Sequence, residues 1–149
     1  MHNVLLVIHV LSVIVWLGAG IGATYIGSRL TAEGGEIAVK WLRLGETMGP
    51  RLYGPVSGLT LLSGIGLVLT SDAYGFGSLF VILGMTVWVV VAIGNGAYAG
   101  RQEKKLLVAT EDGDEPTRRE TTRLLNRFVA VEYALLVAIV IAMIYRWGA

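Results

Sequence analysis

Inside the apolar stretches of this chain, the side chains that could carry chemistry are the imidazole of His9 and the carboxylate of Glu132. Ionisable groups in such stretches are costly in a bilayer and are usually functional or paired. A helix rises about 1.5 Å per residue, which places His9 roughly 9 Å below the outer end of a helix that begins near Asn3. Glu132 then lies about 6 Å above the inner end of a helix that begins near Phe128. About 15 Å of depth separates them in a ~30 Å core, so we expect no shared metal site and no histidine–carboxylate dyad.

The spacing of residues around His9 suggests a cofactor face. At about 100° per residue, Ser12, Trp16, Gly20 and Gly27 fall on or near the same side of the helix as His9. A flat macrocycle could rest on the groove left by the two glycines while the imidazole reaches its metal. Neutral imidazole is also the commonest metal ligand in proteins.

The same spacing fits a histidine that has no cofactor. Its imidazole would then hydrogen bond a polar neighbour near the bundle axis, and the candidates are Ser57, Ser63 and Asn95. Spacing alone leaves both interpretations open, the haem or metal ligand and the hydrogen-bonded core histidine.

Glu132 lies at the depth of several arginines at the ends of neighbouring apolar stretches. A desolvated carboxylate is neutralised either by taking up a proton or by an opposite charge. We expect a structural ion pair with Arg51 or Arg101 at the inner rim. A proton-relay or ligand role is the alternative.

Composition identifies the class of protein that must position these residues. Of 149 residues, 54% are hydrophobic, 15% are charged and 20 are glycine, whereas soluble chains average about 25% charged residues and about 7% glycine. The absence of cysteine excludes disulfides, thiolate metal sites and iron–sulfur clusters. A net charge of +1 gives no electrostatic support for nucleic-acid binding. The chain is therefore predicted to be an integral membrane protein whose main partner is the lipid bilayer.

Four runs are long enough to span a bilayer, which needs about 20 apolar residues per helix. We predict an all-α, four-helix bundle in which residues 1–149 form a single transmembrane domain, with spans near 3–28, 52–71, 79–100 and 125–146. The segments between spans one and two and between spans three and four hold 11 of the 12 basic residues, and only Arg146 lies elsewhere. Basic residues favour the cytoplasmic side, so a multi-pass topology with both termini outside is expected.

Two connecting segments also have recognisable patterns. The apolar residues Ile37, Trp41, Leu44 and Met48 follow helical spacing opposite charged residues, which predicts a short amphipathic helix lying flat on the membrane surface. Residues 49–50 (GP) should end this helix before span two. Residues 109–122 are rich in charged side chains, with one glycine and one proline, and are predicted to form a polar loop.

Three short motifs resemble a bacterial superfamily of small helical membrane proteins. They are residues 9–18 (HVLSVIVWLG), residues 48–55 (MGPRLYGP) leading to Gly64, and residues 123–126 (RLLN). The superfamily includes copper-resistance D-like proteins, HemJ-type membrane protoporphyrinogen oxidases and an uncharacterised predicted integral-membrane family, to which this chain is most similar. The resemblance implies a bacterial cytoplasmic-membrane protein in which the first-helix histidine, here His9, binds haem b near the outer side.

The resemblance does not extend to the residues that serve porphyrinogen oxidation. HemJ-type oxidases use a lysine in a later span as second axial group, but span three has neither Lys nor His, and Asn126 is followed by Arg127 and Phe128 instead of the oxidase pattern. Oxidase activity is therefore disfavoured. Haem would be five-coordinate through His9, or bridged by a second His9 in a homodimer, or completed by Met85.

We therefore expect a redox-active haem protein with His9 as the metal ligand. The other candidate cofactor-binding residues are Trp16 and Gly20 beside the porphyrin, and Arg51, Arg123 and Asn126 at the inner rim. One alternative is a copper or small-solute transporter, although its thioethers (Met48, Met85, Met143) are dispersed in the sequence. Another is an accessory or structural subunit whose glycine-rich faces dock a larger membrane complex.

Overall fold

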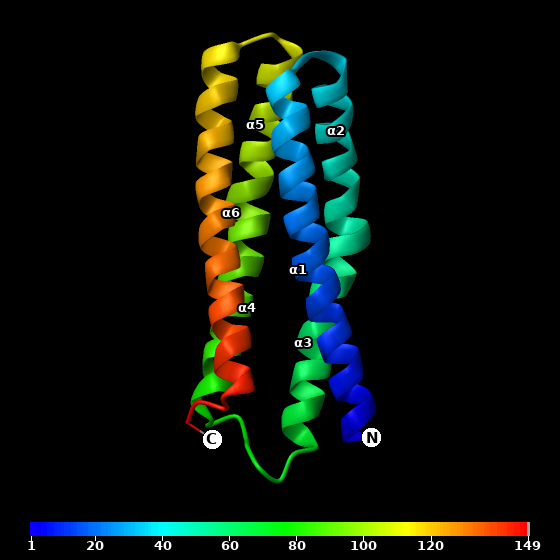
Figure 1. The fold of residues 1–149 in the computed structure, drawn as a ribbon, viewed down its shortest axis with the longest axis vertical. Helices are drawn as coiled ribbons and strands as arrows, with labels where there is room; N and C mark the ends of the chain where they lie inside the picture. The colour runs from blue at the N-terminus through cyan, green and yellow to red at the C-terminus, as the bar shows by residue number, and fades with distance from the viewer. Residues whose placement is uncertain (149) are drawn as a thin grey trace.

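The computed structural model describes residues 1–148, which form long helices joined by short connections (Figure 1). Two π-helical segments join shorter helices end to end, so that Gly35–Leu69 and Leu79–Glu111 are each continuous. The elements are α1 (His2–Glu33), α2 (Gly35–Met48), η1 (Gly49–Tyr53), α3 (Gly54–Leu69), α4 (Leu79–Ile93), η2 (Gly94–Ala99), α5 (Gly100–Glu111) and α6 (Glu115–Ile144). No strand occurs within the described residues.

The four continuous helices lie side by side and alternate in direction, with both termini and the α3–α4 connection at one end (Figure 1). The first helix packs along α2 and α3, and α6 packs along α4 and α5. At the end away from the termini, α2 also packs on α5, whereas nearer the termini α3 and α4 barely meet. The α1–α3 pair and the α4–α6 pair therefore form two separate walls in that half of the molecule.

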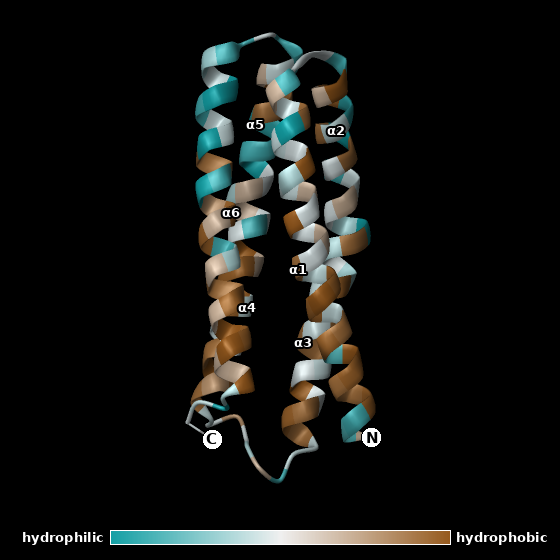
Figure 2. Ribbon diagram, viewed as in Figure 1, coloured by the Kyte–Doolittle hydropathy of each residue, from teal (hydrophilic) through white to brown (hydrophobic). Residues whose placement is uncertain are grey.

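All four helices are long and apolar enough to cross a membrane, which confirms the prediction of an all-helical, multi-pass membrane protein. Apolar residues dominate the half that holds the termini, and polar residues dominate the opposite end (Figure 2). Many apolar side chains are exposed, among them Val7, Ile14, Ile93 and Ile144, as expected for a lipid-facing surface. Helices of 30 to 35 residues are about 45–53 Å long, which is longer than a ~30 Å hydrocarbon core.

The amphipathic segment that ends at Met48 does not form a separate surface helix. It belongs to α2, which stands in line with α3 and packs against α1 and α5 (Figure 1). The prediction failed because Pro50 does not end the helix. It lies in η1, where the wider turn lets the N–H of Gly54 bond the carbonyl of Gly49, and the chain continues as a helix through the proline.

Most of the segment predicted as a polar loop, residues 109–122, is helical. The connection between α5 and α6 is only residues 112–114. Asp114 starts α6 by accepting a hydrogen bond from the backbone N–H of Thr117 at 3.2 Å, and Pro116 occupies the first turn, where its missing N–H costs nothing. The many charged residues predict a loop, but in the structure they lie on helix ends that extend beyond the apolar region.

Candidate functional site

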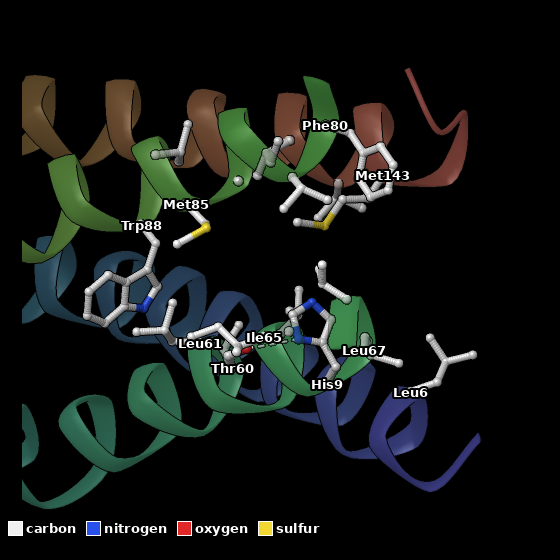
Figure 3. Close-up of a pocket in the computed structure, with 18 of the residues that line it drawn as sticks. Leu6, His9, Thr60, Leu61, Ile65, Leu67, Phe80, Met85, Trp88 and Met143 are labelled. Atoms are coloured by element: carbon white, nitrogen blue, oxygen red, sulfur yellow. Dashed lines mark hydrogen bonds between the residues drawn. The ribbon is translucent and has the colours of Figure 1, made fainter. Parts of the chain in front are cut away.

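A cavity of about 280 Å³ separates the two walls in the half of the molecule near the termini. Its lining is mostly apolar, and the imidazole of His9 points into it (Figure 3). All four continuous helices contribute to the lining. Side chains that shape it include Trp16, Leu61, Ile65, Phe80, Met85, Trp88 and Met143.

The hydrogen bonds of His9 determine which ring nitrogen is free. Its Nδ1 lies 2.9 Å from the backbone oxygen of Thr60 and 3.2 Å from Oγ of Ser63. A carbonyl oxygen can only accept, so Nδ1 carries the proton and donates it. The lone pair then resides on Nε2, on the side of the ring that faces the cavity (Figure 3). A neutral imidazole held by a backbone carbonyl in this way is the usual state of a metal-binding histidine.

The position of the imidazole is determined by α1 and α3 together. Ser12 donates to the backbone oxygen of His9 at 2.8 Å, and Thr60 donates to Ser12 Oγ at 2.9 Å. Gly64 lies against the ring, because a Cβ there would be only 3.1 Å from Cε1 of His9. The helix-helix contact thus aims the imidazole while leaving Nε2 unpaired among the described residues.

Two methionines lie on the wall opposite His9. Met85 comes from α4 and Met143 from α6, and both sulfur atoms face the cavity (Figure 3). Gly84 makes room for the second of them, because a Cβ at that position would lie 2.8 Å from Cε of Met143. The thioethers that are dispersed in the sequence are therefore partly brought together, next to the histidine.

Two polar side chains from near the two termini also line the cavity. They are His2 and Arg146. The Nδ1 atom of His2 is 3.0 Å from Oγ1 of Thr70, and the guanidinium of Arg146 stands 5.9 Å from the ring centroid of Tyr74. Arg146 was not predicted as a site residue. It is the one basic residue outside the segments that join spans one and two and spans three and four, and this unusual position could have pointed to it.

The predicted glycine groove beside His9 is filled by the protein itself, so this part of the prediction is wrong. Trp16 does line the cavity. Gly20, however, lies directly against the hydroxyl of Tyr133, and a Cβ on Gly27 would be 2.5 Å from the indole nitrogen of Trp41. Helical spacing identifies residues on one face but does not reveal which neighbouring side chain covers them.

The predicted inner-rim residues lie away from this cavity. Arg123 and Asn126 line a second groove, between α1 and α6, and Arg51 is exposed in η1. Ser28 of α1 borders that groove, and the 19 residues from His9 to Ser28 correspond to about 28 Å along the helix. These three residues therefore do not share a site with His9 in this structure.

Glu132 accepts a hydrogen bond from the amide of Asn95 at 3.0 Å and does not form the predicted ion pair. Its side chain is buried, with 8% of the residue exposed. Neither Arg51 nor Arg101 takes part in any ion pair within residues 1–148. The π-helix η2 carries Asn95, so a neutral donor on the neighbouring helix takes the place of the expected arginine.

Comparisons with protein-family models, with curated proteins and with solved structures found no match. The cavity itself is therefore the basis for assigning a function. Within residues 1–148, no three His, Asp or Glu side chains gather in a metal-binding group. A metal at His9 would need thioether ligands or a cofactor that supplies its own.

Proposed function

We propose that this chain is a haem-binding, redox-active membrane protein in which Nε2 of His9 is an axial ligand of haem b. The observation that most strongly supports this proposal is the hydrogen bond from His9 Nδ1 to the Thr60 carbonyl, which leaves the lone pair of Nε2 directed into an apolar cavity. Haem, when bound, supplies one-electron redox chemistry at its iron. The four helices would act as a transmembrane bundle that encloses the site.

The residues around the cavity fit such a group. The apolar walls, with Trp16 and Trp88 among them, suit the faces of a porphyrin. A thioether from Met85 or Met143 would hold the iron on its other side. His2 and Arg146, which also line the cavity, would attract the propionates. The cavity volume of about 280 Å³ is slightly below the ~300–1,000 Å³ typical of ligand sites, so the cavity must widen to admit a porphyrin. Separating the walls would break the hydrogen bond that Trp88 of α4 donates to the backbone oxygen of Ser57 of α3 at 3.1 Å, although α3 and α4 otherwise make few contacts.

Titration of the purified protein with haem tests the proposal, and the chain offers a matched control. His2 and His9 are its two histidines, and both line the cavity. We expect His9→Ala to lose the Soret band of the complex, whereas His2→Ala should keep the wavelength of the band. A complex of unchanged affinity and spectrum in His9→Ala would rule out axial ligation by His9.

A Cu(I) site is a second candidate, favoured by the shared position of His9, Met85 and Met143 around one cavity. Soft thioether ligands select Cu(I), and imidazole also suits copper. This site would serve copper binding or transport. Competition with a chromophoric Cu(I) chelator should show one ion bound per chain, and the Met85→Leu/Met143→Leu variant should lose it. If that variant binds Cu(I) as tightly as the wild type does, the copper proposal fails.

We further propose that the protein lies in a bacterial cytoplasmic membrane with both termini on the outer side, as the distribution of Lys and Arg suggests. The absence of native cysteine makes single-cysteine labelling clean. In intact cells, a membrane-impermeant maleimide should label Asp72→Cys in the α3–α4 connection and leave Gly113→Cys in the α5–α6 connection unlabelled. The opposite pattern would reverse the orientation.

A further inference from the structure

A second groove lies between the last turns of α1 and the first turns of α6, at the polar end of the molecule. Its volume is about 610 Å³. Four of its lining residues are arginines, Arg118, Arg119, Arg123 and Arg127, and one is a glutamate, Glu115. The groove therefore carries an excess of three positive charges.

The four arginines differ in how they are engaged. Arg118 forms an ion pair with Glu115 and donates to the backbone oxygen of Thr31, which ties α6 to the end of α1. Arg119 also pairs with Glu115, at 2.6 Å. Arg123 and Arg127 form no hydrogen bond and no ion pair with the side chains of residues 1–148. They are four residues apart, so they share one face of α6 and can bind the same anion.

The groove continues into an apolar surface on the membrane side. Ala130 lines the groove itself, and the exposed residues Val137 and Ile141 follow it at helical spacing on the same face of α6. On α1, the exposed residues Tyr25 and Ile21 lie three and seven residues before Ser28, which borders the groove. A ligand held here would have its anionic part among arginines and its apolar part along the two helices.

We infer that this groove binds the phosphate headgroup of an anionic phospholipid, with an acyl chain along the α1–α6 surface. Guanidinium groups recognise phosphate through paired hydrogen bonds. Basic pockets between helices at the cytoplasmic membrane surface are typical sites for anionic lipid headgroups. A free phosphate would make no use of the apolar continuation. A haem held at His9 is about 28 Å away along the helix axis, too far for its propionates to reach.

Native mass spectrometry of the delipidated protein tests this inference, with dioleoyl phosphatidylglycerol and dioleoyl phosphatidylcholine as probes. The wild type should bind phosphatidylglycerol in preference to phosphatidylcholine. Arg123→Gln/Arg127→Gln should weaken phosphatidylglycerol binding about 30-fold, equivalent to about 1 kcal/mol for each arginine. The control Arg101→Gln/Lys104→Gln removes the same charge from exposed positions of α5 outside the groove, and should change binding by less than about threefold.

Three outcomes would overturn the inference. Equal losses in the two double variants would mean that only general surface charge attracts the lipid. Equal binding of both lipids by the wild type would show that the headgroup charge is not recognised. Displacement of phosphatidylglycerol by an equal concentration of inorganic phosphate would indicate a site for soluble anions. If the double variant does not fold, Arg127→Gln alone provides the test, with an expected loss of about fivefold.

Discussion

Replacing Gly64 with alanine tests whether contact with α3 holds the imidazole of His9 in position for a metal. The added methyl carbon would lie 3.1 Å from Cε1 of His9, whereas ordinary contact begins at 3.4 Å. The ring must therefore withdraw from α3 by about 0.3 Å, which lengthens its 2.9 Å bond to the Thr60 carbonyl. Weakening the partner of a metal-binding histidine typically costs about 10–100-fold in affinity. Because this displacement is small, we expect haem to bind Gly64→Ala about tenfold more weakly.

Gly66 provides a matched control for this substitution. A methyl group there would also lie 3.1 Å from its nearest neighbour, but that neighbour is the flexible end of Leu5. Haem titration followed by absorbance measures affinity. Thermal unfolding in the same detergent shows whether a loss of affinity is only a loss of stability. Gly66→Ala should bind haem as the wild type does. The reasoning is refuted if Gly64→Ala keeps full affinity, or if both variants lose affinity equally.

The remaining predictions concern packing and pH. Gly94→Ala would bring a methyl group within 2.8 Å of Cζ of Phe128 and should lower stability by about 1–3 kcal/mol, seen as a lower Tm. At Gly96 an added methyl group would meet nothing beyond its own local helix within 4 Å, so Gly96→Ala should not lower Tm. An equal fall in Tm for the two variants would contradict this account of the packing at Gly94. The hydroxyl and backbone N–H of Thr117 lower the pKa of Asp114 below its ordinary value of 3.8. Because the pKa is lower in the folded state, the stabilisation is complete above the ordinary pKa of 3.8 and is lost as pH falls through the folded-state pKa. Asp114→Ala should therefore flatten the acid side of a plot of unfolding free energy against pH. Parallel curves for the two proteins would contradict this prediction.

The four membrane-crossing helices could be predicted because bilayer thickness imposes a minimum apolar length that is visible in the sequence. Their full extent could not. Pro50 was expected to end a helix, but a π-turn accommodates it. The charges of residues 109–122 were expected to form a loop, but helices that extend beyond the bilayer keep such charges in water. Polarity in the sequence therefore did not indicate where these helices end.

The site could be predicted in part. Position within an apolar helix identified His9, and helical spacing placed Trp16 beside it, on the wall of the same cavity. Met143 and Arg146 were not assigned to the site because they follow His9 by more than 130 residues, and only the direction of α6 brings them back to it. Helical spacing also could not show that Tyr133 fills the space beside Gly20.

The claim that His9 presents a free Nε2 to a metal-binding cavity is tested most directly by visible absorption spectra of the haem-loaded protein, oxidised and dithionite-reduced. The account predicts a Soret band that shifts on reduction in the wild type and is lost in His9→Ala, while His2→Ala retains it. A protein that binds no haem, or a His9→Ala variant whose two spectra match those of the wild type, would contradict it.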